Sequence, residues 1–104
     1  MTPDGFDDLI HAPLRLTLCA TLYHVEELEF SALTEGLEIS ESTLSKHAKA
    51  LSDAGYLLIH KRKQLVGRPR TWLELTIQGR IAYTGHVKAL RDLTDGVDLS
   101  AAPS

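Results

Sequence analysis

The sequence predicts a small α+β domain, mainly α-helical, in which a three-helix core precedes a β-hairpin and a C-terminal helix. The chain has 104 residues and is 43% hydrophobic, which matches the size and apolar content of one globular domain. Helical periodicity recurs on both sides of a stretch in which two β-rich runs flank turn residues. We expect one domain over residues 1–95 and a flexible tail over residues 96–104.

The first long helix is expected over residues 14–25, after a short helix within residues 6–11 and Pro13 at a first-turn position. Its apolar residues form two stripes on opposite sides. One stripe contains Leu14, Leu18, Leu22 and Val25, and the other contains Ala12, Leu16, Cys19 and Tyr23. Because a surface helix needs only one apolar face, two faces indicate burial in the core or against a second subunit.

The second helix is short and is expected over residues 30–37, with Ser31 as its N-cap and Gly36 near its end. An acidic link precedes it, and we expect this link to be exposed. It consists of Glu26, Glu27 and Glu29.

A third helix is predicted over residues 41–54. Ser40 is a suitable N-cap for it, and Gly55 suits the left-handed conformation that ends a helix. Its core-facing stripe has the i, i+4, i+7 spacing and consists of Leu44, Ala48 and Leu51.

A β-hairpin follows. Residues 56–63 begin as a β-rich run and end in bases, and residues 72–75 alternate between two faces. Gly67 and Pro69 lie between the two runs and favour a turn. We therefore predict two strands around a basic tip, which we assign to residues 64–71.

The final helix is predicted over residues 77–94, with Thr76 as its cap. Its apolar stripe covers about half of the circumference, as expected from the helical repeat. The stripe consists of Ala82, Tyr83, Val87, Ala89, Leu90 and Leu93. Such a stripe is wider than one small core needs, so part of it is expected to form an oligomer contact.

The order of these elements is typical of a winged helix-turn-helix, in which the second helix of the motif enters the DNA major groove. Opposite the core stripe, the helix over residues 41–54 carries hydroxyl groups and lysines in its first two turns. We expect this reading helix to contact bases and phosphates through Ser42, Thr43, Ser45, Lys46 and Lys49. His47 lies at the edge of the stripe and fits a packed histidine as well as it fits a phosphate contact.

The hairpin tip, or wing, supplies a second set of candidate DNA contacts. Arg68 and Arg70 flank a proline that restricts the backbone, and guanidinium groups suit the negative potential of a narrow minor groove. Lys61 and Lys63 add charge at the end of the first strand, so all four bases are candidates.

Charge is distributed unevenly along the chain. The formal net charge is −3, which alone argues against a nucleic-acid partner. Between Ser42 and Leu73, however, there are seven bases and one acid, a net charge of +6. The remaining residues carry four bases and 13 acids, a net charge of −9. A chain divided in this way can present a cationic face to phosphates.

These motifs together resemble the winged-helix regulators of the MarR and ArsR superfamily, over about residues 6–93. The matching segments are Ile39-Ser40, Leu44-Ser45-Lys46-His47, Asp53-Ala54-Gly55-Tyr56-Leu57, Gly67-Arg68-Pro69-Arg70-Thr71 and Leu75-Thr76-x-x-Gly79-Arg80. The resemblance implies a transcriptional regulator that binds double-stranded DNA as a homodimer. It places the reading helices in successive major grooves and the wings in flanking minor grooves. The dimer would pair through helices near residues 6–25 and 77–94, and any small-molecule effector, of unknown identity, would bind between these helices or at the dimer contact.

Other classes of function are disfavoured by the sequence. It contains no Gly-rich phosphate loop, nucleophile elbow or close acid pair, so we expect no enzyme activity and no cofactor. Metal-sensing ArsR-type members carry paired cysteines, whereas this chain has Cys19 alone, and its histidines lack compact ligand spacing. We therefore expect no metal site.

Three alternatives remain open. Cys19 fits a core residue better than a nucleophile, but a thiol redox switch is a second reading. A winged helix that binds only other proteins is an alternative to DNA binding, and RNA is a further partner of such domains. With no apolar segment long enough for a membrane span and an acidic opening segment unlike a signal peptide, we expect a cytoplasmic protein with no membrane contact.

Overall fold

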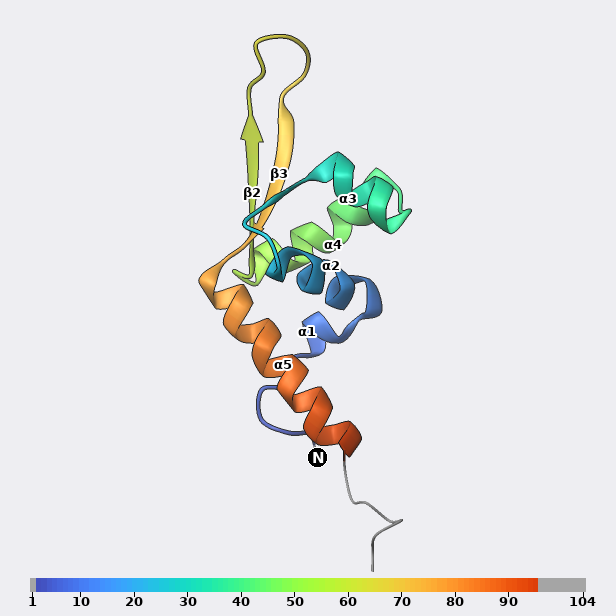
Figure 1. Cartoon of the computed structure of the whole chain (residues 1–104), viewed down its shortest axis with the longest axis vertical. Coiled ribbons are helices and arrows are strands. Elements are labelled where there is room, and N and C mark those ends of the chain that lie inside the picture. The colour runs from blue at the N-terminus through green and yellow to red at the C-terminus, as the bar shows by residue number, and fades with distance from the viewer. Residues whose placement is uncertain (1, 96–104) are drawn as a thin grey trace, which may run out of the picture.

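Helices pack against the base of a small antiparallel sheet, whose β2–β3 hairpin extends beyond them, in the computed structural model, which describes residues 2–95 (Figure 1). The predicted winged helix-turn-helix fold is confirmed. The elements are α1 (Asp8–His11), α2 (Pro13–Tyr23), β1 (Leu28–Glu29), α3 (Phe30–Leu37), α4 (Glu41–Asp53), β2 (Leu57–Arg62), β3 (Arg70–Leu75) and α5 (Ile77–Asp95). The tail expected over residues 96–104 lies outside the described residues. None of the helices within residues 2–95 combines the length and apolar content needed to cross a membrane.

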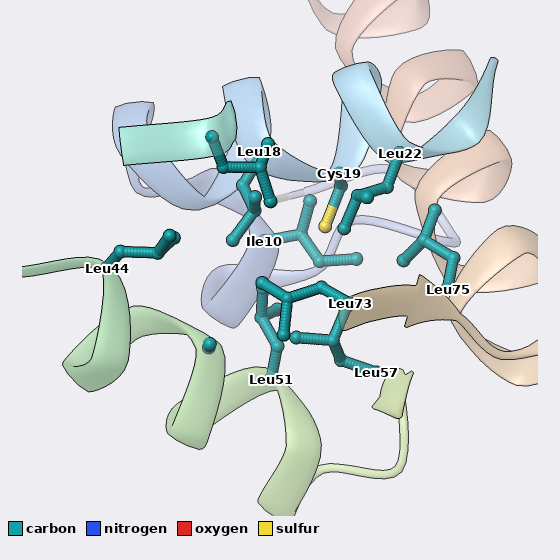
Figure 2. Packing of buried hydrophobic residues seen from close by; sticks show 11 residues of the cluster. Ile10, Leu18, Cys19, Leu22, Leu44, Leu51, Leu57, Leu73 and Leu75 are labelled. Carbon is teal, nitrogen blue, oxygen red and sulfur yellow. The ribbon is translucent and has the colours of Figure 1, made fainter. Parts of the chain in front are cut away.

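The core lies where α2, α4 and the base of the hairpin meet (Figure 2). The predicted stripe of α4 is confirmed, since Leu44, Ala48 and Leu51 are all buried. Both stripes of α2 also contribute, through Leu18 and Leu22 on one side and Cys19 on the other. α2 is buried on two sides because it lies between α1, α4, α5 and β3. Its second stripe therefore needs no second subunit, at least at these positions.

Helix ends follow the predicted local signals in three places. Ser40 Oγ accepts a hydrogen bond from the Thr43 amide at 3.1 Å and caps α4. Gly55 follows α4 with a φ of +83°, a conformation that costs glycine little. Thr76 Oγ1 accepts from the Gly79 amide at 2.9 Å and donates to the Gly55 carbonyl at 2.7 Å. These bonds join the end of α4 to the start of α5 and fix the base of the hairpin.

The prediction of Ser31 as an N-cap was wrong. α3 spans the predicted residues, Phe30–Leu37, but its cap position is Glu29, two residues before Ser31, and Glu29 makes no side-chain hydrogen bond there. Glu29 is extended there because it also pairs with Trp72 of β3. The pairing of β1 with β3 therefore decides where α3 begins, and the preference of serine for the N-cap position does not.

The prediction of an exposed acidic link is confirmed for Glu26 but was wrong for Glu27 and Glu29. Leu28 and Glu29 form β1, which adds to the hairpin and gives a sheet of order β1-β3-β2. The side chains of Glu27 and Glu29 are only 24% and 22% exposed. Because β1 covers the edge of β3, its backbone groups replace water as partners of that strand.

The N-terminal segment is attached to the domain through Asp7. Its carboxylate accepts from the Ile10 amide at 3.0 Å and from the Tyr56 hydroxyl at 2.6 Å, and the Tyr56 bond raises the pKa of that hydroxyl to about 12. The Asp7 amide donates to Nδ1 of His86 at 2.9 Å, and His86 is fully buried on α5. Asp7 therefore joins α1, the start of β2 and α5, with Ile10 buried beneath it.

α5 lies close to the base of the hairpin at Gly79. A β-carbon built on Gly79 would lie 2.1 Å from the carbonyl oxygen of Tyr56. No side chain fits in that space, so glycine permits this approach of α5. The predicted stripe of α5 is used in part by the domain itself, since Ala89 is buried, whereas Leu93 remains half-exposed.

Candidate nucleic-acid interface

The polar face of α4 points away from the core. Ser42, Ser45, Lys46 and Lys49 are exposed there, while the core stripe is on the opposite side. Lys46 has no acidic side chain within 4.0 Å among the described residues. Lys49 pairs with Asp53 at 2.9 Å, but both side chains are mostly exposed, so the pair is weak and a phosphate can replace the carboxylate.

Hydroxyl groups at the start of α4 are organised by the cap. Ser40 Oγ donates to Thr43 Oγ1 at 2.8 Å and lies 3.2 Å from Ser42 Oγ. Thr43 is half-buried, so its hydroxyl serves this network first. Ser42 and Ser45 are the exposed hydroxyls of the first two turns, and they are therefore better placed than Thr43 for contact with a base edge.

His47 lies between the core and the surface. Its Nδ1 is 3.0 Å from Nη1 of Arg15, whose guanidinium also donates to the Leu9 carbonyl. Partial burial, followed by the adjacent Arg15 charge, lowers the pKa of His47, so its imidazole is neutral at pH 7. With Nδ1 facing the Arg15 donor, His47 joins α4 to α2. Its role as a DNA contact remains a prediction.

The hairpin has two distinct faces, because residues that pair across strands share a face. His60 pairs with Trp72, and Arg62 pairs with Arg70, so these four side chains lie on the outer face. Ile59 pairs with Leu73 and Lys61 with Thr71, on the face that continues from the core. Lys61 therefore lies on the face toward α4, whereas Arg62 lies on the outer face.

The outer-face arginines are neutralised by carboxylates of β1 and the residue before it. Glu27 binds Arg62 through two contacts of 2.7 Å, and Arg62 also lies over the Trp72 ring at 5.0 Å. Glu29 binds Arg70 through one contact of 3.2 Å. Two arginines directly opposite each other would repel, and the two carboxylates offset this repulsion. Arg70 is thus part of an ion pair at the start of β3, and its predicted DNA contact is not tested by this arrangement.

On its other face, the wing forms a groove of about 620 Å³ with the start of α3 and the exposed side of α4. Ser45 and Ala48 line it from α4, Ile59 and Lys61 from β2, and Arg68 from the loop. Glu29, Glu41 and Arg70 also line it, so the ion pair of Arg70 and Glu29 borders this groove as well as the outer face. Lys61 and Arg68 have no ion-pair partner among residues 2–95. The groove therefore places a hydroxyl of the reading helix opposite two cations of the wing.

Beyond the groove, the loop between β2 and β3 extends past the helices (Figure 1). Residues 63–69 form this loop, so the tip predicted at residues 64–71 begins one residue earlier and ends before β3 starts at Arg70. Lys63 and Arg68 are exposed and lie near its two ends. The candidate residues thus lie on two elements, α4 and the hairpin, as the sequence predicts.

One group of side chains was not expected from the sequence. Potential ligand atoms of Glu27, His60 and Glu74 lie within 4.8 Å of one another on the outer face of the sheet. His60 Nε2 and Glu74 Oε1 are 3.0 Å apart, and Glu27 already binds Arg62. These groups therefore satisfy one another within the protein. No sequence signal brings them together, because they come from β2, β3 and the residue that precedes β1.

Cys19 is fully buried between α2 and the sheet (Figure 2). Burial, with a further contribution from the Asp7 carboxylate, raises the pKa of the Cys19 thiol to about 11. A thiolate is the reactive form of cysteine, so this environment favours a core residue over a redox switch.

The helix pair α3–α4, the hairpin and the flanking helices define a winged helix-turn-helix protein. Comparison with known proteins extends this assignment to a family, because a model of the winged helix DNA-binding domain matches residues 14–94. The chain belongs to this family. Its members are DNA-binding transcriptional regulators, which agrees with the resemblance indicated by the motifs.

Individual proteins are similar to this chain in sequence or in fold. An uncharacterised protein of Methanocaldococcus jannaschii is 27% identical over 90 residues, which cover 86% of this chain and 97% of that protein. The structure of a transcriptional regulator homologue from Pyrococcus horikoshii superposes with a TM-score of 0.79 at 26% identity, covering 88% of this chain and 89% of that one. The heme sensor protein PefR of Streptococcus agalactiae shares the fold, with a TM-score of 0.66 at 23% identity over 89% of this chain and 67% of that one.

Proposed function

We propose that this chain regulates transcription by binding specific sequences in duplex DNA, with α4 in the major groove and the wing over residues 64–71 in the adjacent minor groove. The observation that carries the proposal is the groove between α4 and the wing, lined by Ser45, Lys61 and Arg68. A cationic groove between two projecting elements suits one phosphate backbone, with base edges on one side and a minor groove on the other.

The roles of individual residues follow from their exposure. Lys46, Lys61, Lys63 and Arg68 carry charges that no carboxylate of the described residues neutralises, and we assign them to phosphates. Ser42 and Ser45 face outward from the first turns of α4, and we assign them to base edges. Asp53 accompanies Lys49 at the far end of the helix, where a carboxylate would limit further approach of DNA.

We further propose that the chain acts as a homodimer. Ile77 and Ile81 lie one turn apart on α5 and are 79% and 67% exposed. A shallow hollow beside them is lined by Tyr23, Arg80, Ile81 and Thr84, so α2 and α5 contribute to one partly apolar surface. Burying two isoleucines from each of two copies would favour pairing. Two reading helices would then contact half-sites about 10 base pairs apart, or a multiple of that spacing.

A small molecule would most readily act at this contact between copies. The solved structures of similar fold include PefR with bound heme and NadR with bound 4-hydroxyphenylacetate. We propose that a small-molecule effector of this chain binds between the terminal helices, where it would change the spacing of the two reading helices. We expect the regulator to act in the cytoplasm, where its DNA is.

Selection of bound duplexes from a random pool tests the proposed reading role. We expect enrichment of a two-part motif, and a Ser45→Ala/Lys46→Ala variant should bind the selected duplex more weakly and with relaxed preference. A Lys88→Ala/Arg91→Ala variant, which changes exposed cations of α5, should keep that preference. Equal affinity for selected and random duplexes would refute sequence-specific reading and favour a winged helix that binds other macromolecules.

The proposed dimer has its own test. Light scattering or sedimentation at micromolar concentration should give a mass near twice that of one chain. Ile81→Glu places a charge in the apolar contact and should yield a monomer, whereas Ile59→Glu on the sheet should not. A monomeric wild-type protein would contradict the homodimer.

A further inference from the structure

Two apolar side chains occupy the tip of the wing. Leu65 and Val66 have relative exposures of 106% and 89%, the highest of any large hydrophobic residue described. They are adjacent in a loop that extends beyond the helices, and neither belongs to the core cluster or the hydrophobic residues packed against it (Figure 1). Exposure of apolar side chains to water is unfavourable, and the stability of the fold does not explain why these two side chains are apolar.

The surroundings of this pair are cationic. Lys61 and Lys63 precede it and Arg68 follows it, and none of the three has an ion-pair partner among residues 2–95. No atom lies within 4 Å of the position that a β-carbon on Gly67 would occupy, so the tip is not held against the domain. An apolar loop tip flanked by cations complements a partner that has anionic groups on its outside and apolar groups inside. Duplex DNA has this arrangement, because its phosphates lie outside the stacked bases.

We propose that Leu65 and Val66 insert between base pairs from the minor groove and bend the duplex. The inference rests on the proposed function, because it requires α4 and the wing to engage DNA. Lys61, Lys63 and Arg68 would hold the two phosphate strands on either side, and the apolar pair would enter the opened base step. Side chains of this kind act as wedges that unstack bases and kink DNA toward the major groove.

Insertion would add sequence preference without any base hydrogen bond. Pyrimidine–purine steps such as TA are easily unstacked, whereas A-tracts are stiff. The site beneath each wing should therefore favour a flexible step. This preference differs from the reading by α4, which depends on hydrogen bonds in the major groove.

The test uses the full-length protein and a duplex selected by it, labelled at both ends for energy transfer. We expect wild-type protein to increase transfer, and to bind a TA step under the wing roughly tenfold more tightly than an A-tract there. Leu65→Ser/Val66→Ser should abolish the increase and this preference while leaving the salt dependence of binding unchanged. Arg68→Ala should show the reverse, with bending retained and a salt slope smaller by about 0.9 for each phosphate that is no longer neutralised.

Each outcome has one meaning. The loop residues are exposed, so the serine variant should unfold at the wild-type temperature, which confirms that folding is intact. Retained bending by that variant overturns the wedge but leaves DNA binding standing. Absence of binding to any duplex overturns both proposals. Binding to phosphatidylserine vesicles that requires Leu65 and Val66, without duplex bending, would assign the tip to a lipid surface instead.

Discussion

The close approach of α5 to the hairpin base makes Gly79→Ala the most informative single substitution. The new β-carbon would lie 2.1 Å from the Tyr56 carbonyl oxygen, 2.9 Å from its carbon and 3.0 Å from its α-carbon. All three are backbone atoms, so no rotamer change relieves the clash. Alanine gains about 1 kcal/mol in helix propensity over glycine, but overpacking and the backbone shift that it forces together cost about 1–3 kcal/mol, and more where, as here, the contact is far below van der Waals distance.

We therefore expect Gly79→Ala to lower the free energy of unfolding by about 2 kcal/mol, which corresponds to a Tm lower by about 8–16 °C for a domain of this size. Thermal denaturation followed by circular dichroism measures the change. Gly36→Ala is the matched control, since Gly36 lies in α3 with no atom within 4 Å of the new β-carbon. It should raise stability by up to about 1 kcal/mol. Equal effects of the two substitutions would refute the reasoning from close packing.

Three further predictions concern charge and chemistry. Glu29→Gln should break the single ion pair of Arg70 and lower the free energy of unfolding by about 0–1 kcal/mol. The variant should bind duplex DNA more tightly than the wild-type protein, with a steeper salt dependence, because Arg70 is then free to contact a phosphate. Unchanged binding would show that Arg70 does not contact DNA. Native Cys19, with its pKa raised to about 11, should react with iodoacetamide at least about a hundredfold more slowly than in the unfolded chain, and rapid alkylation would revive the redox switch. Burial and the nearby His11 hold the pKa of His86 below its ordinary value of 6.5, so the unfolded chain binds this proton more readily. Stability should then be full above pH 6.5 and decline below it, and His86→Gln should flatten the decline seen in urea titrations; an unaltered pH profile would contradict it.

Local signals predicted much of this fold. Ser40 and Thr76 each cap a helix by accepting a hydrogen bond from the amide three residues further along the chain, and Gly55 follows α4 in a left-handed backbone conformation. Single residues were therefore sufficient to predict where these helices begin and end. The apolar stripe of α4 was predictable for the same reason, since a 3.6-residue period is a local property. The polar face of that helix followed directly from it.

Long-range pairing was not predictable in this way. Glu29 pairs with Trp72 and contacts Arg70, 41 residues away, and no local pattern reveals such a register. The same pairing displaced Ser31 as a cap. The buried His86 accepts a hydrogen bond from the amide of Asp7, 79 residues away. Within the candidate interface, the sequence therefore identified the cations, but only the strand register separates those that are paired from those that are free among the described residues.

The central claim is that the groove between α4 and the wing holds a DNA backbone, and the salt dependence of duplex binding tests it most directly. Fluorescence anisotropy should give log affinity that falls linearly with log salt concentration for the wild-type protein. Lys61→Ala/Arg68→Ala should weaken binding and reduce the slope by about 0.9 for each phosphate that the variant fails to neutralise, while Lys88→Ala/Arg91→Ala should leave the slope unchanged. The same slope for all three proteins would contradict the account.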